Sequence, residues 1–130
     1  MRVIAVNVTS TVRLAKYVLP PMVDRGRGRV LFTASSMGSA PEPMFATYAA
    51  SEAFVTSFAE AVRKELSDTG VSVTTLVPGP TDTDFYDRAG MQDTPLARGP
   101  HADPEDVAGA GLEALFAGRD RVTVGAPQLS

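Results

Sequence analysis

The chain has 130 residues, of which 44% are apolar and 21% are charged, with a formal net charge of −3; this balance is typical of one globular domain. The small negative charge gives no electrostatic reason to expect nucleic acid or an anionic membrane as a partner. The absence of cysteine excludes disulfides and thiolate chemistry, and no apolar run approaches the ~18 residues of a membrane span. The first residues lack the layout of a signal peptide, so we expect a cytoplasmic protein.

A long helix is expected from Arg2 to Asp24, because apolar residues recur there at steps of three and four. Pro20 and Pro21 should kink or end this helix, so its last turn is expected to be irregular. After a turn rich in arginine and glycine, residues 29–33 predict a short strand. This strand is nearly continuous in apolar residues, as expected where both faces of a parallel sheet are covered.

A second long helix is expected over Met44–Ser67, after a loop rich in glycine and proline. Gly70 stands where the C-terminal glycine of a helix belongs. A β-branched strand is expected over Val71–Val77, and Pro78-Gly79-Pro80 should end it. Apolar residues at helical spacing predict the buried stripe of the second helix: Phe54, Phe58, Ala61, Val62 and Leu66.

Residues 81–100 show no firm period and predict a loop with a short helix near residues 84–89. Asp103-Pro104-Glu105-Asp106 predicts a helix start, with Asp as the cap, Pro at the first position and acids in the first turn. This helix should end near Gly118, and residues 121–124 predict a last strand. The alternation of helices and strands indicates an α/β fold with about three parallel strands, part of a doubly wound nucleotide-binding sheet.

A serine at a strand end and a tyrosine on the next helix suggest general acid chemistry. Ser35 follows the first expected strand, and Tyr48 lies 48 − 35 = 13 residues later on the second expected helix. The serine hydroxyl can orient a carbonyl oxygen while the phenol gives that oxygen a proton. A simple turn serine and a half-buried helix tyrosine are the structural alternatives.

The stretch Ser35–Glu52 resembles the active-site segment of the short-chain dehydrogenase/reductase family, in which a serine precedes Tyr-x-x-x-Lys by about a dozen residues. Ser35 is in the family's register, whereas Ser36 is one residue too close. The tyrosine motif reads Tyr48-Ala49-Ala50-Ser51-Glu52, so glutamate stands in place of the family's lysine. The resemblance implies NAD or NADP as cofactor and a small-molecule carbonyl or alcohol as substrate.

Two further segments match the family's site. Asn7, 48 − 7 = 41 residues before Tyr48, resembles the helix asparagine whose backbone holds a water in a proton relay; a satisfied core amide is the alternative. Residues 78–83 (PGPTDT) resemble the Pro-Gly motif, in which the backbone near Thr81 faces the nicotinamide carboxamide and the Thr83 hydroxyl meets phosphate. A strand-ending turn needs the same residues. By resemblance, the cofactor-binding residues are Tyr48, Pro78, Gly79, Thr81 and Thr83, and the loop Phe85–Pro100 is the substrate lid.

Glu52 shares a helix face with Tyr48, four residues away. A lysine at this position would favour the phenolate and bind the cofactor's ribose, whereas a carboxylate disfavours the phenolate. Glu52 could still accept hydrogen bonds from ribose hydroxyls, as acidic residues do in other nucleotide-binding folds. We therefore expect impaired catalysis. Two alternatives remain open: a non-catalytic remnant that binds a nucleotide or partner, and a structural assembly module.

The sequence contains no glycine-rich turn between a strand and a helix, which usually binds the cofactor's phosphates. We therefore expect residues 1–130 to form a single domain equivalent to the C-terminal half of the family's fold, as a fragment, a truncated product or a mis-called start. Helices Arg2–Asp24 and Met44–Ser67 predict a homo-oligomer, because the corresponding family helices commonly pack against a second subunit. His101 stands alone, so a metal site is not expected.

Overall fold

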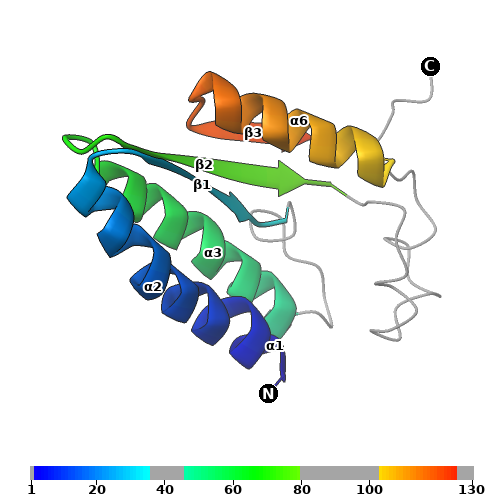
Figure 1. Cartoon of the computed structure of the whole chain (residues 1–130). Helices are drawn as coiled ribbons and strands as arrows, with labels where there is room; N and C mark the ends of the chain where they lie inside the picture. Colours follow the sequence, from blue (N-terminus) through cyan, green and yellow to red (C-terminus); the bar gives the residue numbers. More distant parts are fainter. Residues whose placement is uncertain (1, 36–45, 80–102, 126–130) are drawn as a thin grey trace.

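Three parallel strands form one sheet, in the order β1-β2-β3. The computed structural model describes residues 2–35, 46–79 and 103–125, and its strands are β1 (Gly28–Thr33), β2 (Val71–Pro78) and β3 (Arg121–Val124). The helices are α1 (Arg2–Ile4), η1 (Ala5–Thr9), α2 (Ser10–Arg25), α3 (Ala46–Glu65) and α6 (Pro104–Ala117). Figure 1 shows α2 and α3 on one face of the sheet and α6 on the other. The predicted α/β fold with three parallel strands is confirmed.

The strand register brings two candidate site segments to the same edge of the sheet. Thr33 of β1 pairs with Leu76 of β2, and the Ala34 N–H donates to the Leu76 carbonyl oxygen at 2.8 Å. Ser35 and Pro78 therefore lie at the carboxyl ends of neighbouring parallel strands. Ligands of open α/β sheets bind at this edge.

The N-terminal helix is continuous over Arg2–Arg25, but its geometry changes near its start. The residues of η1 form a π-helix, a wide turn that is frequent at functional sites. The prediction of an irregular last turn is wrong, because Pro20 and Pro21 lie inside α2. The helix ends at Arg25, and Gly26 caps it in the left-handed conformation with φ 72°. The carbonyl groups four residues before the prolines belong to exposed residues, so water can satisfy them.

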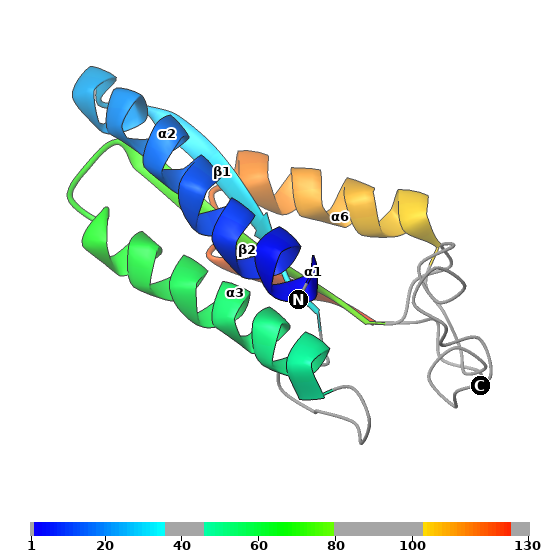
Figure 2. The ribbon, with the colours of Figure 1, turned by 90° about the horizontal axis from the view of Figure 1, so that it is seen from below.

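The buried face of α3 differs from the predicted stripe. Val62 is buried and Phe58 and Leu66 pack against the core, but Phe54 is 37% exposed and Ala61 is also exposed. Helix α3 contacts both the sheet and the N-terminal helix, which lies beside it in Figure 2, so its buried face is wider than one stripe. The buried residues of α3 are Ala49, Ser51, Glu52, Val55, Ala59 and Val62.

A close backbone contact fixes the turn between α3 and β2. Gly70 is not the C-terminal glycine of α3, as the sequence predicts, because α3 ends at Glu65 and the described glycines with positive φ are Gly26 and Gly118. A Cβ atom on Gly70 would instead lie 1.6 Å from the Gly26 carbonyl oxygen. Glycine is needed at this position because only it allows the two turns to approach this closely.

Helix α6 covers the second face of the sheet, and its ends match the prediction. The Asp103 side chain accepts a hydrogen bond from the Glu105 N–H at 2.8 Å, and Gly118 ends the helix with φ 71°. A Cβ on Gly111 would lie 3.0 Å from the Leu76 side chain, which shows how closely α6 packs on β2. Among the described residues, no helix has both the length and the apolar character needed to cross a membrane.

Candidate active site

Ser35 follows β1, directly after Ala34, whose N–H donates to the Leu76 carbonyl oxygen of β2. It borders a cavity of about 230 Å³ formed by α3, the end of β2 and the start of β3. This volume is below the roughly 300–1,000 Å³ of typical ligand pockets, so the cavity suits a small polar group rather than a whole cofactor. The lining residues are Ser35, Ala53, Thr56, Ser57, Glu60, Val77 and Arg121.

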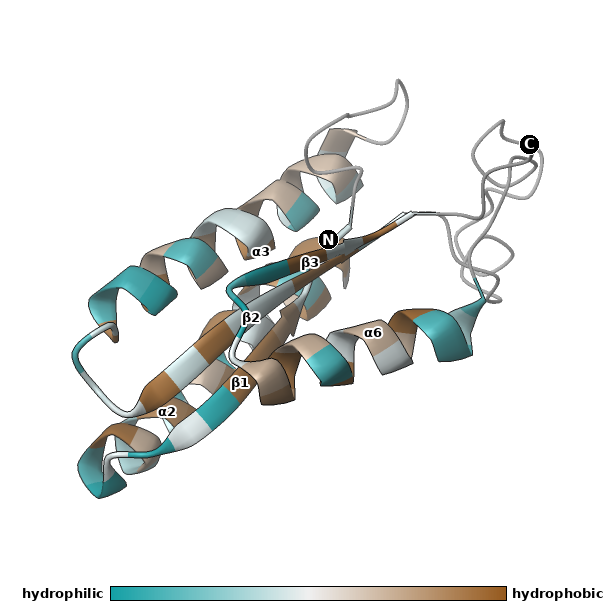
Figure 3. Cartoon of the chain, turned by 90° about the horizontal axis from the view of Figure 1, so that it is seen from above, coloured by the Kyte–Doolittle hydropathy of each residue, from teal (hydrophilic) through white to brown (hydrophobic). Residues whose placement is uncertain are grey.

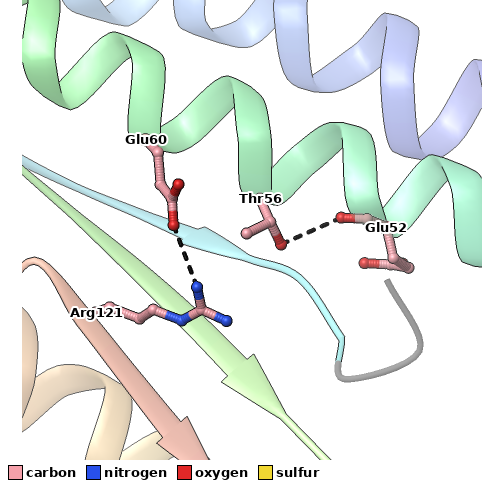
Figure 4. A network of polar contacts seen from close by, with 4 residues as sticks. All are labelled: Glu52, Thr56, Glu60 and Arg121. Atoms are coloured by element: carbon pink, nitrogen blue, oxygen red, sulfur yellow. Dashed lines mark hydrogen bonds and ion pairs between the residues drawn. The ribbon is translucent and has the colours of Figure 1, made fainter. Parts of the chain in front are cut away.

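Polar contacts along α3 border this cavity (Figure 4). The Arg121 guanidinium donates to Glu60 Oε1 at 3.2 Å, and the two side chains are 44% and 43% exposed. The Thr56 hydroxyl donates to the backbone carbonyl oxygen of Glu52 at 3.3 Å. Exposed ion pairs contribute about 0–1 kcal/mol to the free energy of unfolding. The pair therefore connects β3 to α3 but adds little to stability. The sequence prediction missed it, because 61 residues separate the partners.

Tyr48 and Glu52 share a face of α3, as their spacing predicts. Tyr48 lies in the first turn of the helix and is half-buried, whereas Glu52 is only 7% exposed. The Tyr48 side chain is hydrogen-bonded to Glu52. An ionised carboxyl group can only accept, so the phenol donates to it, and this contact favours the neutral phenol.

Asn7 contacts the same carboxylate from the neighbouring helix. Its Nδ2 atom donates to Glu52 Oε1 at 3.0 Å and to Ser51 Oγ at 3.1 Å. The Ser51 hydroxyl in turn donates to the Tyr48 carbonyl oxygen at 2.7 Å. The Asn7 side-chain NH2 group therefore links η1 to α3, while its proposed backbone role in a water relay stays a prediction. Ser51 was missed by the sequence prediction; its only signal was its position beside Glu52.

The Glu52 carboxyl is buried and forms no ion pair with a described side chain. Burial raises its pKa above the ordinary value, and the hydrogen bond from Tyr48 offsets part of this rise. The folded protein therefore binds this proton more tightly than the unfolded chain does. The contribution of Glu52 to the free energy of unfolding is therefore greatest below the ordinary pKa of glutamate. This contribution is lost as the pH rises through the folded-state pKa.

We expect Glu52→Gln to stabilise the protein at neutral pH and to have little effect in acid. Glutamine keeps an acceptor oxygen for Asn7 but carries no buried charge. The gain should begin above about pH 4.3 and grow by at most about 1.4 kcal/mol per pH unit. Urea unfolding at a series of pH values measures it, with the exposed Glu65→Gln on the same helix as control. A gain that does not depend on pH, or that the control reproduces, would contradict this account.

The Pro-Gly segment is described only at its start. Pro78 pairs with Val124 of β3, and the Gly79 N–H donates to the Val124 carbonyl oxygen at 2.7 Å. Strand β2 thus ends at Pro78, one residue later than predicted, and the roles of Pro78 and Gly79 toward a cofactor stay predictions. The remaining candidates lie in residues 80–102, outside the described residues: Thr81, Thr83, the expected helix at 84–89, the lid Phe85–Pro100 and His101.

Residues 1–93 match the family model described as short chain dehydrogenase. The chain therefore belongs to the short-chain dehydrogenase family. An uncharacterised short-chain type dehydrogenase/reductase of Sinorhizobium fredii is 40% identical over 83 residues, which are 64% of this chain and 34% of that protein. A very-long-chain 3-oxoacyl-CoA reductase of Mycosarcoma maydis is 42% identical over 74 residues, which are 57% of this chain and 21% of that protein.

The fold is also similar to solved members of this family. A short-chain dehydrogenase from Sphingobium yanoikuyae in complex with NADPH matches with a TM-score of 0.83 and 29% identity, covering 92% of this chain and 46% of that one. The chain thus spans less than half the length of each of these relatives. Its three-stranded sheet corresponds to part of a larger fold.

Proposed function

We propose that this chain carries the proton-donating part of an NAD(P)-dependent oxidoreductase that acts on a carbonyl or alcohol. The observation that carries the proposal is the position of Ser35 just beyond β1 and of Tyr48 in the first turn of α3, in a chain of this family. The NADPH complex of the Sphingobium relative supports NAD or NADP as cofactor. The cofactor, when bound, exchanges a hydride with the substrate carbon.

Two hydroxyl groups of this chain act on the substrate oxygen in this proposal. Ser35 Oγ orients the oxygen by a hydrogen bond, and the Tyr48 phenol exchanges a proton with it. Glu52 works against the second step, because it holds the phenol hydrogen in a contact that disfavours the phenolate. We propose that catalysis is impaired for this reason.

The residues present fit the nicotinamide of the cofactor better than they fit its phosphate groups and ribose. Ser35, Pro78 and Gly79 lie at the carboxyl ends of adjacent strands, the edge where nicotinamide chemistry takes place in doubly wound sheets. The sequence offers no glycine-rich turn for the phosphates. The Glu52 carboxyl is buried and already bound by Asn7, which leaves it poorly placed for ribose hydroxyls. These features favour weak cofactor binding by this chain alone.

Two alternatives have observations of their own. The buried Glu52, in place of the family's lysine, favours a non-catalytic remnant. An apolar groove of about 470 Å³ between the N-terminal helix and α3 favours assembly into a homo-oligomer. The groove is lined by Ile4, Val8, Ala46, Thr47, Ala50, Ser51 and Phe54.

Calorimetric titration of the purified 130-residue chain with NADPH and with NADH tests the proposal. Saturable binding of either one supports the oxidoreductase and justifies a screen of ketones and aldehydes. A folded sample that binds neither favours the remnant or the assembly module for this chain. Sedimentation of the same sample separates those two, because a stable folded monomer contradicts the assembly module.

A further inference from the structure

A second cavity, of about 760 Å³, lies at the amino ends of β1 and β2. It is therefore at the opposite edge of the sheet from Ser35 and Pro78. The end of α2 and the end of α6 complete it, and Figure 3 shows the C-terminal end of α6 beside the start of β1. Among the described residues, no acidic side chain lines the cavity. The lining residues are Arg25, Arg27, Gly28, Arg29, Gly70, Ser72, Phe116, Ala117 and Gly118.

Three arginines within five residues give this cavity its charge. Arg25, Arg27 and Arg29 are all exposed, and none forms an ion pair with a described carboxylate. The Arg29 guanidinium carbon lies 5.3 Å from the centre of the Phe116 ring, so this side chain extends toward α6. Like charges that line one cavity repel one another, and an anion bound there would relieve the repulsion.

The hydroxyl of Ser72 is an unsatisfied polar group in the wall of this cavity. Ser72 is the register partner of Arg29 on the neighbouring strand. Its Oγ atom is buried and has no hydrogen-bond partner among the described residues. Buried hydroxyl groups almost always have a partner, because an unmade hydrogen bond is costly. A ligand oxygen next to Arg29 would supply one after a small shift of the side chains that cover the hydroxyl.

The backbone around the arginines is held in one conformation. The Arg27 N–H donates to the Met22 carbonyl oxygen at 3.1 Å, after the left-handed turn at Gly26. The contact between Gly70 and Gly26 fixes this turn against the start of β2. The end of α6 brings a negative partial charge of roughly half a unit, which is small beside three guanidinium charges. The described lining of the cavity therefore carries more positive than negative charge.

We propose that this cavity binds a small molecule that carries a phosphate group. Guanidinium groups pair with phosphate oxygens through two parallel hydrogen bonds, and the Ser72 hydroxyl adds a further donor. The Phe116 ring is 64% exposed and offers an apolar surface beside the anion. The site is separate from the proposed cofactor position and does not depend on the oxidoreductase function.

Calorimetric titration with inorganic pyrophosphate, in a buffer free of phosphate and at low ionic strength, tests the proposal. We expect saturable binding that weakens as salt is added. Arg27→Ala and Arg29→Ala should each weaken it about tenfold or more. Arg13→Ala is the matched control, because Arg13 is an exposed arginine of α2 outside the cavity lining. Circular dichroism confirms that each variant is folded.

The outcomes distinguish organic from inorganic phosphate, and binding in the cavity from nonspecific attraction to positive charge. AMP binding more tightly than pyrophosphate would identify an organic phosphate, and equal or weaker binding an inorganic one. NADPH carries phosphate groups and could itself bind this cavity, so the NADPH titration is repeated with Arg27→Ala. Binding at the cavity should weaken in this variant, whereas binding at the other edge of the sheet should be unchanged. The proposal is overturned if wild-type protein binds no phosphate compound saturably, or if Arg13→Ala weakens binding as much as the cavity variants.

Discussion

Replacing Gly70 with alanine should destabilise this protein by about 3 kcal/mol or more, at the upper end of what overpacking costs. The added Cβ would lie 1.6 Å from the Gly26 carbonyl oxygen and 2.5 Å from its carbonyl carbon. Both are backbone atoms of the turn between α2 and β1. They cannot move aside as the end of a flexible side chain could. Urea unfolding measures the loss, and failure of the variant to fold is its extreme form.

Gly109→Ala is the matched control for this substitution. Gly109 lies inside α6, and a Cβ there would meet no atom within 4 Å. Alanine should therefore stabilise the helix by roughly 0.5–1 kcal/mol through lower backbone entropy in the unfolded chain. Two identical substitutions are thus expected to act in opposite directions. A Gly70→Ala variant as stable as wild type would show that the two turns separate at little cost.

Elements with local signals could be predicted from the sequence. The strand over Val71–Val77 follows from β-branched residues between breakers, and α6 from Asp103-Pro104 at one end and Gly118 at the other. The role of Gly70 could not be predicted, because its partner Gly26 is 70 − 26 = 44 residues away. The buried face of α3 depends on the neighbouring helix as well as the sheet, and a single periodic stripe does not contain that information.

The contacts of the candidate site also fall into local ones, which the sequence shows, and distant ones, which it does not. The contact of Tyr48 with Glu52 is set by four-residue spacing within one helix, which the sequence shows directly. The contacts of Asn7 with Ser51 and Glu52 cross between helices at separations of 44 and 45 residues. The resemblance placed Asn7 in the site but suggested only a role for its backbone, and the side-chain contact required the structure. This contact holds Glu52 in its buried position.

Glu52→Lys should raise turnover about 100-fold in any cofactor complex that this chain forms, within the range of general acid–base effects. An ammonium group in place of the carboxylate favours the phenolate of Tyr48 and no longer ties up the phenol hydrogen. Asn7 can turn its amide so that the oxygen accepts from the lysine. The absorbance of tyrosinate during a pH titration should show one phenol ionising at lower pH than in wild type.

Two control variants separate the effect of charge from that of shape. Glu52→Gln removes the negative charge without adding a positive one, and should give only part of the gain. Glu65→Lys makes the same change of charge at an exposed position of α3, and should leave both turnover and phenol ionisation unchanged. If Glu52→Lys binds NADPH yet turns over no faster than Glu52→Gln, the positive charge is not what the site lacks. The limit on turnover would then lie outside the contact between Tyr48 and residue 52.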